Sequence, residues 1–373
     1  MSGSKSFFPT PKTLMGPGPS DVHPRVLSAI ARPTIGHLDP EFVELMDEIK
    51  TLLRNTFRTK NRLTLPLSAP GSAAMEAAFA NLVEPGDKVI ICINGVFGGR
   101  MAENVSRMQG ELITIKDDWG QPVSAEKLEA ELRANPDTKL VGFVHAETST
   151  GVKSDVETLC RVAHDHGCLS IVDAVTALAG VELETDLWNA DVVYSGSQKC
   201  LSCPPGISLI TFSELAAEKI QSRNSAIQSW FLDMSLLMAY WDGEGARTYH
   251  HTAPVNSMYG LHESLLMLHE EGLDNSWERH QAMHKLLAVG LEDLGFSYVV
   301  EKECDRLPQL NTVKLPSSVD EKKIRSRLLE EYNLEIGAGL GPFAGNVWRI
   351  GLMGYSARKE NIELCLGALK ACI

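Results

Sequence analysis

In the stretch Val192-Val193-Tyr194-Ser195-Gly196-Ser197-Gln198-Lys199, a β-branched apolar run gives way to glycine and serine and then to a single lysine. Such a run predicts a short buried strand. A second run, Leu169-Ser170-Ile171-Val172, ends in Asp173 in the same way. Because the carboxyl ends of the strands in an open α/β sheet face a shared crevice, we expect Lys199 and Asp173 to lie in one cleft.

The pairing of a lysine with an aspartate has a chemical meaning. A lysine amine can form a Schiff base with pyridoxal 5'-phosphate, and a carboxylate can keep the pyridine nitrogen of that cofactor protonated. Lys199 and Asp173 therefore point to a pyridoxal phosphate site, with both side chains in catalytic roles.

Further apolar runs recur along the chain, at Val89–Ile93, Leu140–Val144 and Ser208–Phe212, with helical periodicity between them at 124–132 and 156–164. Strands that alternate with helices predict an α/β fold with a mostly parallel sheet covered on both faces. From residue 256 a long helical pattern runs to residue 294, followed by short strands and helices typical of a smaller α+β domain. We expect an N-terminal arm over 1–20, a large domain over 21–270 and a small domain over 271–373.

Composition limits the classes of function. The chain has 373 residues, 44% of them hydrophobic, and a formal net charge of −13. This charge argues against nucleic acid or an anionic membrane as the main partner. No apolar run approaches the ~20 residues of a spanning helix, and the N-terminus lacks the form of a secretory signal. We expect a cytoplasmic protein and leave a peroxisomal or mitochondrial location open.

Metal binding is not expected. Cys200 and Cys203 form a C-x-x-C pair, but no second pair completes a zinc site. Two histidine pairs, 164/166 and 280/284, have no third ligand nearby.

Three further segments each have a plain structural interpretation beside a functional one. Gly71 and Ser72 open a helical run, with Ser72 as an expected N-cap, which suits either an ordinary capped helix or a phosphate site. Phe97 follows a predicted strand and fits either core packing or stacking on a planar ring. Arg349 lies in an apolar strand pattern and suits either a structural pair or a bound carboxylate.

Together the motifs resemble the class V aminotransferases of fold type I, and within them the alanine–glyoxylate / serine–pyruvate group. The resemblance covers almost the whole chain. It rests on seven segments in order: 14–20 (LMGPGPS), 147–151 (ETSTG), 172–175 (VDAV), 195–199 (SGSQK), 204–206 (PPG), 249–252 (YHHT) and 349–354 (RIGLMG).

The resemblance implies a large domain with a seven-stranded sheet and a role for each site residue. Lys199 would bind pyridoxal 5'-phosphate covalently and Asp173 would pair with its ring nitrogen. Phe97 would stack on the ring and Thr148 would lie near its hydroxyl. The phosphate would be held by Gly71, Ser72 and Gln198, with Tyr249 and Thr252 from the neighbouring subunit of a homodimer. Arg349 would bind the substrate carboxylate, and Gly36 and His37 would line the pocket.

The implied reaction moves an amino group from alanine or serine to glyoxylate or pyruvate by a ping-pong mechanism. A transaminase with another donor, such as 2-aminoethylphosphonate, ureidoglycine or pyridoxamine, is the main alternative. A cysteine desulfurase-type lyase is disfavoured because Gln198 stands where those enzymes carry histidine. A non-catalytic protein is disfavoured because Lys199 and Asp173 are both retained. One departure from the family is Pro70, which lacks a backbone N–H for the phosphate.

Overall fold

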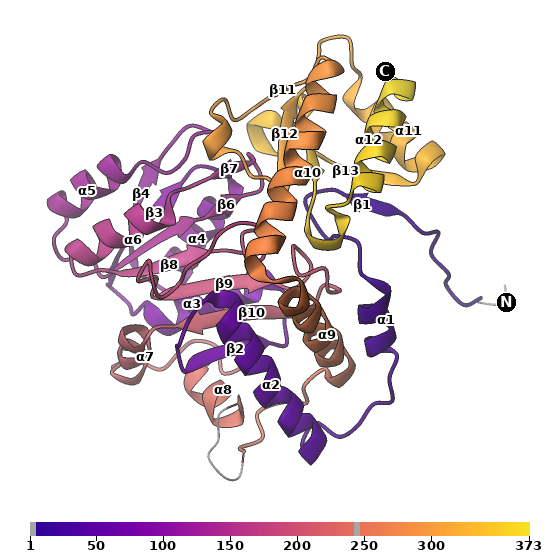
Figure 1. Ribbon diagram of the computed structural model, residues 1–373. Helices are drawn as coiled ribbons and strands as arrows, with labels where there is room; N and C mark the ends of the chain where they lie inside the picture. The colour runs from indigo at the N-terminus through magenta and orange to yellow at the C-terminus, as the bar shows by residue number, and fades with distance from the viewer. Residues whose placement is uncertain (1–4, 242–246) are drawn as a thin grey trace.

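The computed structural model describes residues 5–241 and 247–373, and its centre is a seven-stranded sheet (Figure 1). The strand order is β2-β10-β9-β8-β5-β3-β4. Strand β10 is antiparallel to both of its neighbours, and the other neighbouring pairs are parallel. The strands are β2 (Leu63–Leu67), β3 (Lys88–Ile93), β4 (Glu111–Lys116), β5 (Leu140–Val144), β8 (Leu169–Asp173), β9 (Val192–Gly196) and β10 (Ser208–Phe212). The predicted α/β fold with a mostly parallel sheet is confirmed.

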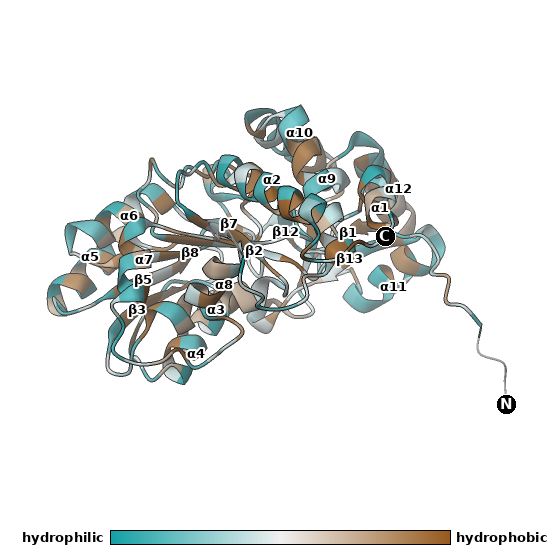
Figure 2. Ribbon diagram, turned by 90° about the horizontal axis from the view of Figure 1, so that it is seen from below, coloured by the Kyte–Doolittle hydropathy of each residue, from teal (hydrophilic) through white to brown (hydrophobic). Residues whose placement is uncertain are grey.

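The apolar runs form strands because helices cover both faces of the sheet and bury nearly every residue of its strands except those of β4. Helices α3, α4 and α7 pack in one group, and α5 packs against α6. In Figure 2 the helices carry both hydrophilic and hydrophobic residues, as expected for elements with one buried face. These helices are α2 (Pro40–Phe57), α3 (Gly71–Leu82), α4 (Val96–Arg107), α5 (Ala125–Ala134), α6 (Val156–Asp165), α7 (Glu214–Gln221) and α8 (Met234–Trp241).

Two strands of this sheet were not predicted. Strand β4 is an edge strand whose residues are mostly exposed or half-buried, so the sequence Glu-Leu-Ile-Thr-Ile-Lys lacks a continuous apolar run. Strand β2 is buried throughout but contains Thr64 and Pro66, which interrupt its apolar pattern. Pro66 is tolerated because β2 is the other edge of the sheet.

A second, five-stranded sheet has the order β1-β13-β14-β12-β11. Strand β1, near the N-terminus, pairs in parallel with β13, so the N-terminal segment joins the sheet formed by the C-terminal part of the chain (Figure 1). Its strands are β1 (Thr13–Met15), β11 (Ser297–Tyr298), β12 (Leu310–Lys314), β13 (Leu334–Ala338) and β14 (Val347–Gly351). The remaining elements are α1 (Pro24–Ile30), the hairpin β6 (Ala146–Glu147) and β7 (Val152–Lys153), α9 (Val255–Glu271), α10 (Leu273–Asp293), α11 (Glu321–Tyr332), α12 (Lys359–Cys372) and short 3₁₀ turns at Glu303–Asp305, Gly341–Phe343 and Gly354–Ser356.

The buried apolar side chains form two clusters, one around each sheet. Helix α10 joins them, because Leu273 lies in the first cluster whereas Leu287 and Leu291 lie in the second. The single helix expected over 256–294 is wrong. Gly272, at φ +89°, ends α9 and begins α10, because glycine adopts this backbone angle without strain. A domain boundary near residue 270 stays a prediction.

Within residues 5–241 and 247–373, none of the helices is at once long and apolar enough to cross a bilayer.

Candidate active site

Lys199 lies three residues beyond the carboxyl end of β9, and its amine donates a hydrogen bond to the carbonyl of Pro17. Burial, together with the nearby charge of Arg349, lowers the pKa of Lys199 to about 8. Gly18 makes room for this side chain, because a Cβ there would lie 2.5 Å from the Lys199 Nζ. A lysine with a lowered pKa has a substantial neutral, nucleophilic fraction near neutral pH.

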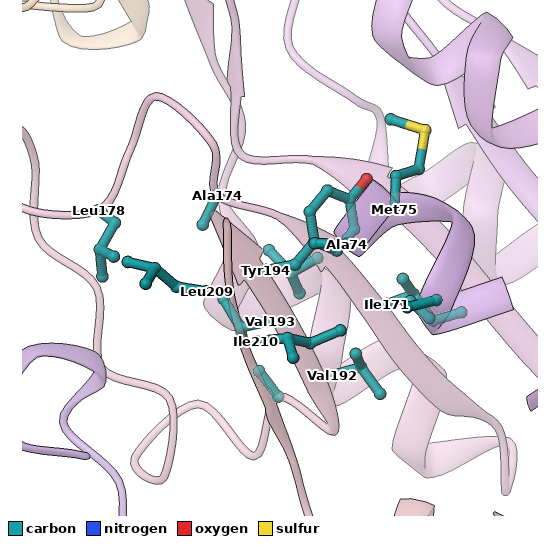
Figure 3. Close-up of a cluster of buried hydrophobic side chains, with 14 of the residues drawn as sticks. Ala74, Met75, Ile171, Ala174, Leu178, Val192, Val193, Tyr194, Leu209 and Ile210 are labelled. Carbon is teal, nitrogen blue, oxygen red and sulfur yellow. The ribbon is translucent and has the colours of Figure 1, made fainter. Parts of the chain in front are cut away.

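Asp173 is the last residue of β8 and is only 3% exposed. Its carboxylate accepts hydrogen bonds from the backbone N–H of Val175 and from the hydroxyl of Tyr194, each at 3.0 Å. Tyr194 brings this hydroxyl into a cluster of apolar side chains (Figure 3). Burial raises the pKa of Asp173 to about 6. The carboxylate is therefore in a setting that a neighbouring positive charge would stabilise.

One cavity of about 210 Å³ contains most of the predicted site residues. It lies at the carboxyl ends of the central strands, where open α/β sheets place their ligands. Seven predicted residues line it: Gly71, Ser72, Phe97, Thr148, Asp173, Gln198 and Lys199.

The start of α3 forms one wall of this cavity. The prediction that Ser72 is the N-cap is wrong. The helix begins at Gly71, with Pro70 at the cap position and no capping side chain. In the described part of the chain the N–H groups of Gly71 and Ser72 have no hydrogen-bond acceptor. The side-chain amide of Gln198 is also uncommitted there, and its Oε1 is buried. These donors at a helix N-terminus suit an anionic group.

Arg349 lies on β14 of the small sheet and is 7% exposed; it does not line the cavity, but it contacts Thr148, which does. Its Nε donates to the carbonyl of Ala338 at 2.8 Å and its Nη1 to the carbonyl of Thr148 at 3.1 Å. Burial lowers the pKa of Arg349 to about 10. Two backbone carbonyls orient the guanidinium without neutralising its charge, which leaves it suited to a carboxylate.

Four predicted residues lie apart from the cavity within one chain. Tyr249 is 58% exposed, and its ring packs against that of His37 at 5.3 Å between centroids. The hydroxyls of Tyr249 and Thr252 lie 3.5 Å apart. Neither these residues nor Gly36 and His37 line the Lys199 cavity.

The structure also brings residues to the site that the sequence did not single out. Met75, Val175, Thr176 and Arg100 line the cavity, and the Arg100 guanidinium lies 4.8 Å from the centroid of the Phe97 ring. Helical spacing from Ser72 and Phe97 was an available signal for Met75 and Arg100, each three residues further along its helix.

The cysteines and histidines do not form a metal site among the described residues, where no three potential ligands gather. Cys200 and Cys203 are buried, and burial raises the pKa of each thiol to about 12. A second hollow of about 730 Å³ lies near Asp117 and Trp188, but it contains none of the predicted site residues.

The donor set of the Lys199 cavity matches pyridoxal phosphate in three respects. A lysine amine of lowered pKa suits an aldehyde, and a buried carboxylate suits a pyridinium nitrogen. Unclaimed N–H groups at the start of α3 suit a phosphate. The residues present therefore fit this cofactor.

Comparison with known proteins agrees with this geometry. The family model "Aminotransferase class-V" matches residues 21–362. The chain is 40% identical over 371 residues to alanine–glyoxylate aminotransferase of Rattus norvegicus, covering 99% of this chain and 89% of that protein. A crystal structure of alanine–glyoxylate aminotransferase from Nostoc sp. superimposes with a TM-score of 0.96 at 46% identity, covering 99% of this chain and 97% of that one. The structure of ureidoglycine–glyoxylate aminotransferase from Bacillus subtilis gives a TM-score of 0.96 at 36% identity, over 99% and 94%.

Proposed function

The chain belongs to the class V aminotransferases, and we propose that it moves an amino group from alanine or serine to glyoxylate or pyruvate. It is a pyridoxal phosphate-dependent transaminase that works by two alternating half-reactions. The observation that carries the proposal is the placement of Lys199 and Asp173 in one cavity beside the uncommitted N–H groups of α3.

Each side chain of the cavity would hold one part of the cofactor. Lys199 would bind it covalently and Asp173 would pair with the ring nitrogen. Phe97 would lie against the ring, Thr148 near the ring hydroxyl, and Gly71, Ser72 and Gln198 at the phosphate. When bound, pyridoxal phosphate supplies an aldehyde that condenses with amines and a ring that accepts the electron pair left at the substrate Cα.

Lys199 has a second role as the base of the reaction. When it is not bound to the cofactor, its free amine would take the proton from the substrate Cα and deliver it to the cofactor carbon that had carried the aldehyde. The lowered pKa favours this role, since a lysine whose pKa is about 8 is partly neutral near neutral pH. Asp173 would stabilise a positive charge on the ring nitrogen. The ring would then accept more readily the negative charge that develops when the Cα proton leaves.

Arg349 would bind the substrate carboxylate through its fork of N–H groups and so orient the Cα proton toward Lys199. Alanine and serine are favoured because alanine–glyoxylate aminotransferases are similar to this chain at 40% and 46% identity over nearly its whole length. A ureidoglycine donor is the second candidate, supported by the likeness to the Bacillus subtilis transaminase at 35% identity over 391 residues.

The active unit would be a homodimer with shared sites. Tyr249 is an exposed aromatic side chain that does not line the cavity of its own chain, so it is free to reach another copy. Tyr249 and Thr252 would complete the phosphate site of the neighbouring subunit, and Gly36 and His37 would line its pocket. Mass measurement in solution tests the dimer: a dimeric holoenzyme is expected, and a fully active monomer would contradict it.

A half-reaction screen tests the substrate. The cofactor-loaded protein is mixed separately with alanine, serine, ureidoglycine, 2-aminoethylphosphonate and pyridoxamine, and conversion of the cofactor to its amine form is followed by absorbance. Alanine or serine is expected to react faster than the other donors. A hydrophobic pocket separates substrates that differ by one methylene by only about 10- to 200-fold, so alanine and serine are both expected to react. Conversion by ureidoglycine alone would replace the proposal with the second candidate.

A further inference from the structure

Glu147 is a fully buried carboxylate that the proposed reaction does not use. It ends β6, beside the cavity, and both of its oxygens accept hydrogen bonds. Oε2 accepts the backbone N–H of Phe97 at 3.0 Å, and Oε1 accepts the N–H and the hydroxyl of Ser149 at 3.0 and 2.6 Å. No ion pair of Glu147 occurs in the described chain. Burial raises the pKa of Glu147, and the hydrogen bonds that its two oxygens accept offset part of the cost of burying the carboxylate.

The bond to Phe97 acts on the first turn of α4. This helix has Gly95 at the cap position, which provides no capping side chain, so its first N–H groups need acceptors from elsewhere. Glu147 accepts that of Phe97, and the Ser149 hydroxyl accepts that of Val96 at 3.0 Å. A Cβ at Gly95 would overlap the side chain of Glu147, so the glycine leaves the space that the carboxylate fills. The hairpin loop therefore caps α4 from outside.

The same loop also contacts the arginine of the small sheet. Thr148 follows Glu147 directly, and its carbonyl accepts the Nη1 of Arg349. The backbone on one side of Glu147 therefore orients Arg349, while its side chain sets the start of the helix that carries Phe97. These two residues are the ones proposed to meet the substrate carboxylate and the cofactor ring.

We propose that Glu147 is a positioning residue that sets the place of the Phe97 ring and the orientation of Arg349 at once. The inference rests on the proposed function, since it assumes that Phe97 and Arg349 meet cofactor and substrate. It adds a residue that touches neither of them. The carboxylate is required because its two oxygens accept from donors on opposite sides, whereas a glutamine has one acceptor oxygen and would turn its NH₂ toward a donor.

The test compares Glu147→Gln with Asp191→Asn. Asp191 is a second buried carboxylate, 2% exposed, which also accepts a backbone N–H and serine hydroxyls. It precedes β9, at the end of the sheet opposite to the cavity, and neither of its chain neighbours lines the cavity. For wild type and both variants we would measure the melting temperature, the dissociation constant of pyridoxal phosphate, the visible circular dichroism of the bound cofactor, and kcat and KM for alanine.

Both variants are expected to melt lower than wild type. Only Glu147→Gln should weaken cofactor binding, by about tenfold, reduce the cofactor dichroism and raise the KM for alanine several-fold. Equal cofactor affinity and dichroism in all three proteins would overturn the inference, as would equal changes in both variants.

If Glu147→Gln does not fold, Ser149→Ala is the second variant. It removes the bridging hydroxyl and should change the same readouts by about threefold; unchanged readouts in Ser149→Ala would then overturn the inference. Failure of the wild type to bind pyridoxal phosphate would instead refute the proposed function.

Discussion

A buried aspartate lies at each end of strands β8 and β9, and the two differ in how fully their carboxylates are hydrogen-bonded. At the amino end, Asp191 accepts hydrogen bonds from the N–H of Ser170 and the hydroxyl of Ser213, and lies 2.9 Å from His164 Nε2. This carboxylate is surrounded by donors and ties three neighbouring segments together. Its arrangement is what a stabilising interaction requires.

At the carboxyl end, Asp173 has two donors and a pKa raised to about 6, while Lys199 has one carbonyl acceptor and a pKa lowered to about 8. Both shifts have burial as their largest cause. At one end of these two strands the buried carboxylate has a full set of donors, which stabilises the fold. At the other end the charged groups have few partners, which leaves them available for a ligand. Strained or costly groups of this kind mark functional sites.

The largest effect is expected from Lys199→Ala. Turnover of alanine with glyoxylate should fall by at least about 10⁴-fold, because the change removes both the covalent attachment and the base. Circular dichroism and thermal melting should show an intact fold, since a buried amine near one carbonyl contributes little stability. Persistent transamination by this variant would refute the catalytic role of Lys199.

Asp173→Asn should have the next largest effect. The neutral amide no longer stabilises a positive ring nitrogen, so kcat should fall by roughly 10²-fold or more, while the KM for alanine changes little. Steady-state kinetics with deuterium at the substrate Cα would show whether proton removal has become slower. An unchanged kcat would contradict the assignment.

Arg349→Lys is expected to act on substrate binding. A lysine keeps the charge but loses the fork of donors, so the KM for alanine should rise by about 10- to 100-fold with a smaller change in kcat. Arg306→Lys is the matched control, because Arg306 also donates to backbone carbonyls, but those of Val300 and Glu301, which do not line the cavity, whereas Arg349 donates to Thr148, which does. Equal KM values for the two variants would contradict a carboxylate role for Arg349.

The smallest expected effect is on the melting temperature, which should rise in Asp173→Asn and fall in Asp191→Asn. An aspartate ionises near pH 4 in the unfolded chain and near pH 6 in the folded chain at Asp173, so the fold loses stability as the pH rises from about 4 to 6, and that loss persists at higher pH. At pH 8 the cofactor-free Asp173→Asn protein should therefore melt higher, by roughly 2 °C.

Asp191→Asn should instead melt lower at the same pH, because it breaks a satisfied network. Calorimetry of the two cofactor-free variants checks the contrast. A lower melting temperature for both would show that Asp173 is as well satisfied as Asp191.

The carboxyl-end half of this contrast could be predicted from the sequence, because apolar runs that finish in polar residues mark where strands end; the role of Asp191 at the amino end was not predicted. The runs before Asp173 and Lys199 predicted their strands, and all five predicted strands of the large sheet occur. The edge strand β4 and the break at Gly272 were missed, because local pattern does not report which edge is exposed or how two helices pack.

The site shows the same limit. Lys199, Asp173 and five other predicted residues share one cavity, because their motifs lie at strand ends and helix starts on the same edge of the sheet. The role of Glu147 was not visible in the sequence, although its motif was noticed. Its function depends on contacts with Phe97 and Ser149 that arise only when the hairpin folds against α4.

Every role proposed for the site depends on a covalent bond between Lys199 and pyridoxal phosphate at the carboxyl end of β9. Reduction of the cofactor-loaded protein with borohydride, followed by proteolysis and mass spectrometry, tests it directly. One stable adduct, located on Lys199, is expected. Recovery of an unmodified Lys199 peptide, or of the adduct on another lysine, would contradict it.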